Sequence, residues 1–535
     1  MRKFTNVLLT ALILLATIMV SCSAPESASL KDPIKIDTGL ISGKVAGDKQ
    51  DVRVYMGVPY AAPPIGNLRW KPPQPAASWQ GVKECVEPGP APLQWAIMGH
   101  PKATSEDCLY LNVWTPATQT TDKLPVMVWF YGGAFEFGDS ASPYYDGTNI
   151  ARHGVIMVTV NYRIGVPGYL AHPLLSKESE HNSSGNYGLL DQIAALQWVQ
   201  NNIAAFGGDP NKVTIFGQSA GAISITCLMV SPLAKGLFQR AICESYADLG
   251  FFSNLKENKY GRESAENEGL RLAKDIGCDD LACLRSKSGA EIMKAGAPPM
   301  DLRAPGNIYV YGPTVDGWAL PDLPINLFEA AKQSNIPLMI GCTADEWTLF
   351  QLLAPPTADA YKVWVTKNFG DYAQQILAKY PAPDDDVVQK SDQQMMKLYA
   401  FACPSKVFAG DMSKVDSKAY FYNFTRVAPG SPEVGAFHAI DIGYELGNMQ
   451  PLLETPEPDK YFDKTDMALS NTMMTYWTNF AKTGDPNGTG LTTWPVYSGD
   501  TGQYMEFGDQ TQVKSNLYTE DCPLLLKAAE YLRNR

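Results

Sequence analysis

The stretch Val213-Thr-Ile-Phe-Gly-Gln-Ser-Ala-Gly221 decides the fold class of this 535-residue chain. Its first four residues are apolar or β-branched and predict a buried strand, and residues 222–229 predict a helix directly behind it. Between them, Gly-x-Ser-x-Gly requires a sharp turn that exposes the Ser219 hydroxyl, and side chains at 217 and 221 would collide there. The positive end of the helix points toward developing negative charge. The pattern predicts Ser219 as a nucleophile.

Further buried strands are predicted on both sides of this turn. Continuous apolar runs bounded by Gly or Pro suit strands that are buried on both faces of a mainly parallel sheet. They span residues 125–131, 155–161, 336–340 and 419–424. Residues 189–200 carry apolar side chains at helical spacing and predict a crossover helix. The alternation predicts an α/β fold with a wound, mostly parallel sheet flanked by helices.

Two other segments are predicted to be helical. Residues 253–304 are polar and helical, and they suit either an insertion over one edge of the sheet or a plain pair of surface helices. Residues 467–482 have the pattern of a long amphipathic helix.

Composition and charge exclude two classes of protein. Apolar residues make up 45% of the chain and charged residues 19%, which is too apolar for a disordered protein. The 44 Lys and Arg residues against 56 Asp and Glu residues give a net charge of −12. Because an acidic chain repels the phosphate backbone, nucleic acid is excluded as a partner.

Residues 1–21 predict an export signal. Arg2 and Lys3 precede an apolar run over residues 7–20, which is too short to span a bilayer. The run ends in Ser21-Cys22 and resembles a bacterial lipoprotein signal, so Cys22 is the candidate lipidation site; ordinary secretion with Cys22 removed is the alternative. Residues 22–33 predict a flexible tether. We expect an exported, cell-envelope protein that contacts the membrane only through its lipid anchor, with one catalytic domain over residues 34–535.

Export favours disulfide pairs among the nine remaining cysteines. No Cys-x-x-Cys spacing supports a zinc site. Cys227, Cys243 and Cys342 lie in apolar surroundings and are expected to be buried free thiols. Three candidate pairs remain, of which the first two bracket loops and the third would join distant parts of the C-terminal half: Cys85–Cys108, Cys278–Cys283 and Cys403–Cys522.

The residues around Ser219 resemble a known family. Phe206-Gly-Gly-Asp-Pro-Asn-Lys-Val-Thr-Ile-Phe-Gly-Gln-Ser-Ala-Gly221 resembles the serine signature of the type-B carboxylesterase and cholinesterase family, and Ser105-Glu-Asp-Cys-Leu-Tyr-Leu-Asn-Val113 resembles its second signature. The similarity continues from about residue 34 to the end of the chain. It implies one α/β-hydrolase domain with helical insertions over the active site, a small-molecule ester substrate, and no metal or organic cofactor. It supports the first two disulfides more than the third.

A nucleophilic serine needs a base, and the base needs an orienting acid. In α/β-hydrolases the order is Ser, acid, His, and His438 is the only histidine after Ser219. The other histidines, expected to be loop or surface residues, are His100, His153, His172 and His181.

Several carboxylates lie between Ser219 and His438. Glu346 follows a predicted strand end and takes the acid's place by its resemblance to the family's Asp-Glu-Gly, although Trp347 stands in place of the Gly. Asp345 and Asp316 remain alternatives.

An oxyanion hole is predicted at the end of the strand over residues 125–131. Tyr131-Gly-Gly-Ala-Phe135 resembles the family's motif, in which small residues let backbone N–H groups reach a developing oxyanion. A plain Gly-rich turn is the alternative. The resemblance assigns the donors to Gly133, Ala134 and Ala220, and the pocket lining to Gly132, Phe135 and Gln218.

Gln218 bears on the substrate, because many relatives carry Glu directly before the nucleophile. A neutral amide does not attract cations, so neutral small alkyl or aryl esters are predicted. Trp95 could hold a cation over its ring, although capping the apolar side of its loop is the simpler role.

Two other functions stay open. One is a non-catalytic binding or adhesion protein on this fold, which the presence of Ser219, Glu346 and His438 disfavours. The other is a deacylase of envelope glycans or lipids. Activity on short and long acyl esters would discriminate them.

Overall fold

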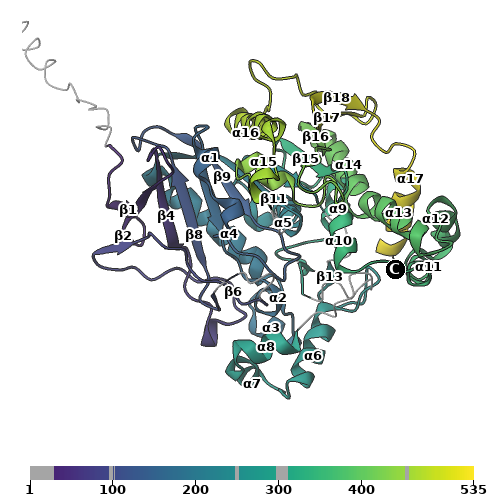
Figure 1. The fold of residues 1–535 in the computed structure, drawn as a ribbon. Coiled ribbons are helices and arrows are strands. Elements are labelled where there is room, and N and C mark those ends of the chain that lie inside the picture. The colour runs from purple at the N-terminus through teal and green to yellow at the C-terminus, as the bar shows by residue number, and fades with distance from the viewer. Residues whose placement is uncertain are drawn as a thin grey trace, which may run out of the picture.

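An eleven-stranded sheet forms the centre of the protein, in the order β18-β17-β16-β15-β12-β11-β9-β10-β8-β4-β3 (Figure 1). The structure, a computed structural model, describes residues 29–95, 101, 103–246, 252–296, 311–451 and 457–534. The predicted export signal, Cys22 and His100 lie outside these residues. The strands are β3 (Lys44–Ala46), β4 (Val52–Pro59), β8 (Tyr110–Thr115), β9 (Leu124–Phe130), β10 (Ile156–Val160), β11 (Gly208–Gln218), β12 (Arg240–Glu244), β15 (Leu338–Thr343), β16 (Ala419–Phe424), β17 (Gln503–Phe507) and β18 (Thr511–Ser515).

The central strands, from β10 through β9, β11, β12, β15 and β16 to β17, are parallel. The strands at the two edges are antiparallel. The prediction of a mostly parallel sheet is confirmed, and all five predicted strands are present. The strand β12, which lies between β11 and β15, was not predicted, because it is short and its ends, Arg240 and Glu244, are charged.

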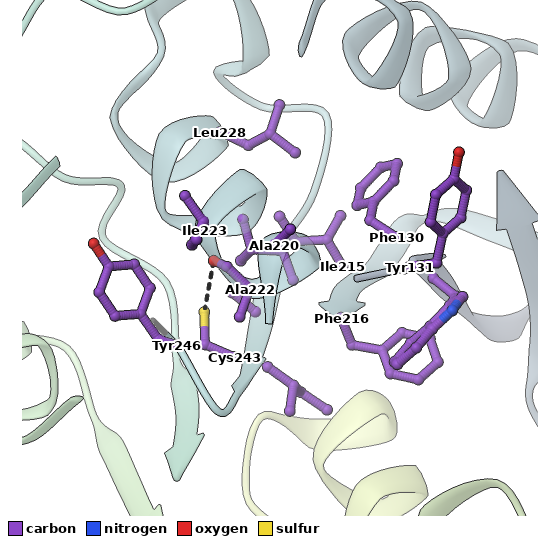
Figure 2. Packing of buried hydrophobic residues seen from close by; sticks show 14 of the residues in the cluster. Phe130, Tyr131, Ile215, Phe216, Ala220, Ala222, Ile223, Leu228, Cys243 and Tyr246 are labelled. Carbon is purple, nitrogen blue, oxygen red and sulfur yellow. Dashed lines mark hydrogen bonds between the residues drawn. The ribbon is translucent and has the colours of Figure 1, made fainter. Parts of the chain in front are cut away.

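Helices cover both faces of this sheet (Figure 1). The predicted crossover helix is α4 (Tyr187–Asn202), the helix behind the nucleophile is α5 (Ala220–Val230), and the long C-terminal helix is α16 (Lys464–Thr483). Every residue of α5 is buried. Figure 2 shows Ala220, Ile223 and Leu228 of this helix in one buried cluster with Ile215 of β11, and Cys243 Sγ directed at the Ala222 carbonyl. The nucleophile turn therefore rests on a rigid apolar core.

The segment over residues 253–304 forms α6 (Ala265–Asp275), α7 (Leu281–Ser286) and α8 (Gly289–Ala295). Its last residues, 297–304, lie outside the described part of the chain. Figure 1 shows these helices together below the sheet, next to α2 (Gly165–Tyr169) and α3 (Pro173–Glu178). A second group was not predicted: α11 (Ala358–Phe369), α12 (Ala373–Lys379), α13 (Asp385–Met396), α14 (Cys403–Asp411) and α17 (Cys522–Arg533). Within the described residues, no helix is long and apolar enough to cross a membrane.

Two predicted disulfides are present in the structure. Cys278–Cys283 closes the loop between α6 and α7. Cys403–Cys522 joins the first residues of α14 and α17. The cysteines expected to be free are unbonded and buried: Cys227, Cys243 and Cys342.

The predicted Cys85–Cys108 disulfide is wrong, because both thiols are free and buried. The Cys85 carbonyl accepts a hydrogen bond from Met56 N, whereas the carbonyl of Leu109, next to Cys108, accepts one from Tyr60 N. Four residues along a strand span about 13 Å, and a disulfide needs Cα atoms within about 7 Å. The pairing along β4 therefore holds the two cysteines apart.

The predicted boundary between the tether and the folded domain, at residue 33, also differs from the structure. Ser29 forms a bridge with Gln119, and Leu30 N donates to Thr118 O at 2.8 Å. Leu30 is only 3% exposed. Residues 29–33 therefore belong to the folded domain, because the apolar side chain of Leu30 is buried in it.

Candidate active site

The strand-to-helix turn has the geometry that its sequence predicts. Ser219 lies between β11 and α5 with φ 57° and ψ −121°, and it is partly exposed while its neighbours are buried. A Cβ at Gly217 would lie 2.3 Å from the Phe130 carbonyl oxygen, and one at Gly221 would lie 1.9 Å from the same atom. Only glycine fits at both positions, so β9 can approach the turn closely enough to bring its own C-terminal loop to Ser219.

That loop is the predicted oxyanion motif. Its first glycine, Gly132, lies so near the turn that a Cβ would come within 3.0 Å of Ser219 Cβ. Gly133 and Ala134 have positive φ angles of 101° and 59°. Within the described chain their N–H groups donate no hydrogen bond, and the N–H of Ala220, first in α5, has no intrahelical acceptor. Three small residues with free backbone donors thus surround the serine.

The loops after β15 and β16 run side by side. Asp345 and Phe437 form a parallel bridge, and Asp345 N donates to Ala436 O at 2.9 Å. This register places Glu346 against His438, with 2.5 Å between Glu346 Oε2 and His438 Nδ1. Glu346 is fully buried, and its other oxygen accepts a hydrogen bond from Thr343 N at 2.7 Å. A carboxylate in this position can fix the ring orientation and accept a hydrogen bond from an Nδ1 proton.

Gln218 lies against the imidazole ring of His438. Its Nε2 is 3.1 Å from His438 Nε2 and 3.4 Å from His438 Nδ1, and its side chain is buried. The amide nitrogen therefore faces both ring nitrogens. No hydrogen bond joins Ser219 Oγ to His438 among the described residues.

The alternative residues have other contacts. Asp345 accepts hydrogen bonds from Ala436 N and Gln393 Nε2, and Asp316 accepts them from Trp318 N and Leu320 N. His172 Nδ1 accepts the Leu174 N–H at the start of α3.

The remaining histidines and Trp347 also have other surroundings. The His181 ring stacks on Trp318 at 3.8 Å. Burial lowers the pKa of His153. Trp347, in place of the family's Gly, is buried and donates to Asp392 Oδ2 at 2.9 Å, so it anchors the Glu346 loop to α13.

Three site residues were not found from the sequence. Phe350 and Phe401 flank the His438 ring at centroid distances of 5.2 and 5.1 Å. Neither lies in a motif. Glu136 follows the oxyanion motif, and its Oε1 is buried without a hydrogen bond within the described chain. Burial raises the pKa of Glu136 to about 8, so it is largely a neutral acid at pH 7.

Two exposed aromatic side chains come from loops that one glutamine ties together. Gln94 Nε2 donates to Gly138 O at 2.7 Å, and Gly138 N donates to Gln94 Oε1 at 2.8 Å. The adjacent residues Trp95 and Phe137 are 52% and 39% exposed. Trp95 therefore does not cap a buried apolar surface, which was its simpler predicted role.

The described residues contain no cluster of three or more His, Cys, Asp or Glu side chains that could hold a metal ion. Side chains at the site can transfer a proton and orient a ring, and backbone N–H groups can donate hydrogen bonds to an oxyanion.

These features define an α/β-hydrolase with a serine at its nucleophile turn. A model of the "Carboxylesterase family" matches residues 31–525. The fumonisin B1 esterase of Sphingopyxis macrogoltabida is 36% identical over 92% of this chain and 90% of its own. Liver carboxylesterase 1 of Oryctolagus cuniculus is 34% identical over 93% and 94% of the two chains.

Solved structures agree with these relatives. A PNB esterase superimposes with a TM-score of 0.78 at 32% identity, over 92% of this chain and 99% of its own. The carboxylesterase Est55 of Geobacillus stearothermophilus gives the same values. The chain belongs to the carboxylesterase family, and it is a carboxylic-ester hydrolase.

Proposed function

We propose that the protein cleaves carboxylic esters through an acyl-enzyme, with Ser219 as nucleophile, His438 as general base and Glu346 as the acid that orients it. The contact between Glu346 Oε2 and His438 Nδ1 carries this proposal, because a proton held on Nδ1 leaves Nε2 to accept the serine's proton. Histidine, acid and serine come from three different strand ends, which is where open α/β sheets place their sites.

In the first half of the reaction, Ser219 Oγ attacks the ester carbonyl while His438 Nε2 takes its proton. The N–H groups of Gly133, Ala134 and Ala220 stabilise the tetrahedral oxyanion. Glu346 stabilises the imidazolium, which then protonates the leaving alcohol and leaves an ester on Ser219.

In the second half, His438 takes a proton from water as the water attacks the acyl carbonyl. The same donors stabilise the second oxyanion. Collapse of this intermediate returns the proton to Ser219 Oγ and releases the carboxylic acid.

An organophosphate tests this assignment. It should modify Ser219 and no other serine, as measured by peptide mass spectrometry, and modification should abolish ester hydrolysis in proportion. Ser219→Ala should lose about a thousandfold or more in kcat. Modification of another serine together with loss of activity would overturn the assignment, and no activity on any ester would favour a binding protein.

We also propose that the substrate is a neutral alkyl or aryl ester. Gln218 supports this, because its uncharged amide occupies the position beside His438 where a carboxylate would attract cations. Rates on p-nitrophenyl esters with acyl chains from acetate to palmitate would test the size of the acyl group. A marked preference for the longest chains would favour a lipid deacylase.

We also propose that the protein acts at the cell envelope. A lipid on Cys22 would anchor the catalytic domain that follows it. The apolar run before Cys22 and the polar stretch after it support this proposal. The two disulfides agree with an oxidising compartment.

A further inference from the structure

Two carboxyl groups meet beneath the nucleophile, outside the group formed by Ser219, His438 and Glu346. Glu244 is the last residue of β12, and its backbone carbonyl accepts the Ser219 N–H at 2.9 Å. Glu445 lies on α15 (Asp441–Leu446), a helix that begins three residues after His438. Both side chains are 0% exposed, and they lie beside each other next to Trp477. The contact thus links the segment that holds the serine to the helix that follows the histidine.

Within the described residues, one side chain donates a hydrogen bond to these two carboxyl groups. Trp477 Nε1, from α16, donates to Glu244 Oε1 at 2.8 Å. Within the described residues, Glu244 Oε2 and both carboxyl oxygens of Glu445 have no donor. No lysine or arginine of the described chain forms an ion pair with either group. Two ionised carboxylates cannot stay in contact without water or a cation, so a proton must lie between them.

The titratable groups around the pair do not supply a positive charge either. Asp441 of α15 is buried beside it, and its pKa is raised to about 7 by burial and by Glu346. Burial raises the pKa of Glu244 to about 8, and the pKa of Glu445 is raised by burial and by Glu244. The other facing groups come from β12, β16 and the turn at residues 143–145, and they are Cys243, Tyr422 and Tyr145. His438 faces Asp441 and not the pair.

We propose that Glu244 and Glu445 share a proton and that this acid pair positions Ser219 against His438. The inference rests on the proposed roles of these two residues. Neither glutamate touches substrate. While the proton is shared, β12 and α15 are held together beneath the turn. Once the last proton is lost, two buried anions repel, α15 moves away from β12, and proton transfer from Ser219 to His438 fails.

Amide substitutions test the shared proton. In Glu445→Gln and in Glu244→Gln, the amide N–H₂ donates to the remaining carboxyl group at any pH, so the link no longer depends on a titrating proton. We expect kcat at pH 7 within about threefold of wild type and an alkaline limb of kcat displaced upward by about one pH unit. Glu445→Leu cannot form the link, so its kcat should fall about tenfold or more while KM stays within about threefold.

Glu329→Gln is a control for the loss of a carboxylate, because Glu329 lies at the surface on α9 (Pro324–Glu329). It should leave both limbs of the pH profile unchanged. The proposal is overturned if Glu445→Gln and Glu445→Leu lose equal activity, or if all variants share the wild-type alkaline limb. If Glu445→Gln does not fold, Glu244→Gln decides in the same way.

A stability measurement, which needs no enzymatic activity, tests the acid pair separately from the proposed role of Ser219. In a Ser219→Ala background, Tm is followed by circular dichroism from pH 5 to 9. Because the folded pair holds protons that the unfolded chain releases above about pH 4.3, its contribution to stability is full below that pH and is lost as pH rises to about 8.

Each carboxyl group that holds its proton only in the folded state changes the unfolding equilibrium about tenfold per pH unit. Glu445→Gln removes one such group, so Tm should fall less steeply as pH rises. An unchanged slope overturns the acid pair whether or not Ser219 is the nucleophile. A flattened slope supports the pair even if organophosphate labelling rejects Ser219.

Discussion

The side-chain nitrogen of Gln218 lies 3.1 Å from Nε2 and 3.4 Å from Nδ1 of His438, so the amide faces both nitrogens of the ring. The residue directly before Ser219 is therefore in contact with the proposed general base. Because the contact is direct and buried, the charge at position 218 acts on the proposed general base as well as on the substrate.

Gln218→Glu should increase activity on cationic esters relative to neutral esters of equal size. A carboxylate beside His438 attracts cations and stabilises the imidazolium. We expect at most about a tenfold change in the kcat/KM ratio between a choline ester and its neutral analogue, or ~1.4 kcal/mol. The low-pH limb of kcat/KM should shift upward, because it reports the free base.

The matched control is Gln197→Glu on the exposed side of α4, which adds the same charge away from the site. It should leave the ratio unchanged. If wild type already prefers choline esters strongly, a different group supplies the cation site, and the proposal of neutral substrates fails.

Glu346→Gln should reduce kcat by about 10³-fold to 10⁴-fold with little effect on folding. The amide keeps the shape of the side chain but cannot stabilise the protonated His438 ring or hold its Nδ1 proton. Steady-state kinetics and circular dichroism would measure the two effects.

Asp345→Asn is the paired variant, because Asp345 bonds the backbone of the His438 loop without touching the ring. It should cost stability and no more than about tenfold in kcat. Equal losses in both variants would count against Glu346 as the orienting acid.

Replacing both Cys403 and Cys522 by serine should lower the free energy of unfolding by ~2–4 kcal/mol. This disulfide closes a loop with a sequence separation of 119, whereas Cys278–Cys283 has a separation of 5. Loop-closure entropy grows with length, so the double serine variant at 278 and 283 should lose less. Chemical denaturation of the two variants gives the comparison, and equal losses would reject the entropic account.

Cys22→Ala should release active enzyme from the membrane fraction into the soluble fraction. The lipid on Cys22 is the proposed anchor, and the catalytic domain needs no other contact with the membrane. Fractionation followed by esterase assays measures the shift, and metabolic labelling with a palmitate analogue identifies the modified residue. Wild-type protein that is fully soluble after export would show that Cys22 is not lipidated.

The nucleophile turn was predictable from the sequence because its geometry is local. Gly217, Ser219 and Gly221 lie within five residues, and steric exclusion at the two glycines leaves one backbone path. The five predicted strands were found for a similar reason, since burial on both faces selects uninterrupted apolar runs. The strand β12 was missed because its apolar run is only three residues long.

The contacts between distant segments were decided by the tertiary structure. Cys85 and Cys108 were expected to pair, but the hydrogen bonds of β4 hold them at separate positions along a strand. Phe350 and Phe401 flank His438 without belonging to any motif. Such contacts depend on strand order and register, which are properties of the whole sheet.

The sequence by itself determined the α/β class, the family, and the candidates Ser219, His438 and Glu346, because each rests on a short pattern and on chain order. The tertiary structure alone decided that Gln218 contacts the His438 ring and that Glu244 lies beside Glu445. These neighbours are about 200 residues apart in the chain. They meet because β11, β12, β15 and β16 are adjacent in the sheet and end at the same edge, and burial there excludes the water that would otherwise bind their polar side chains.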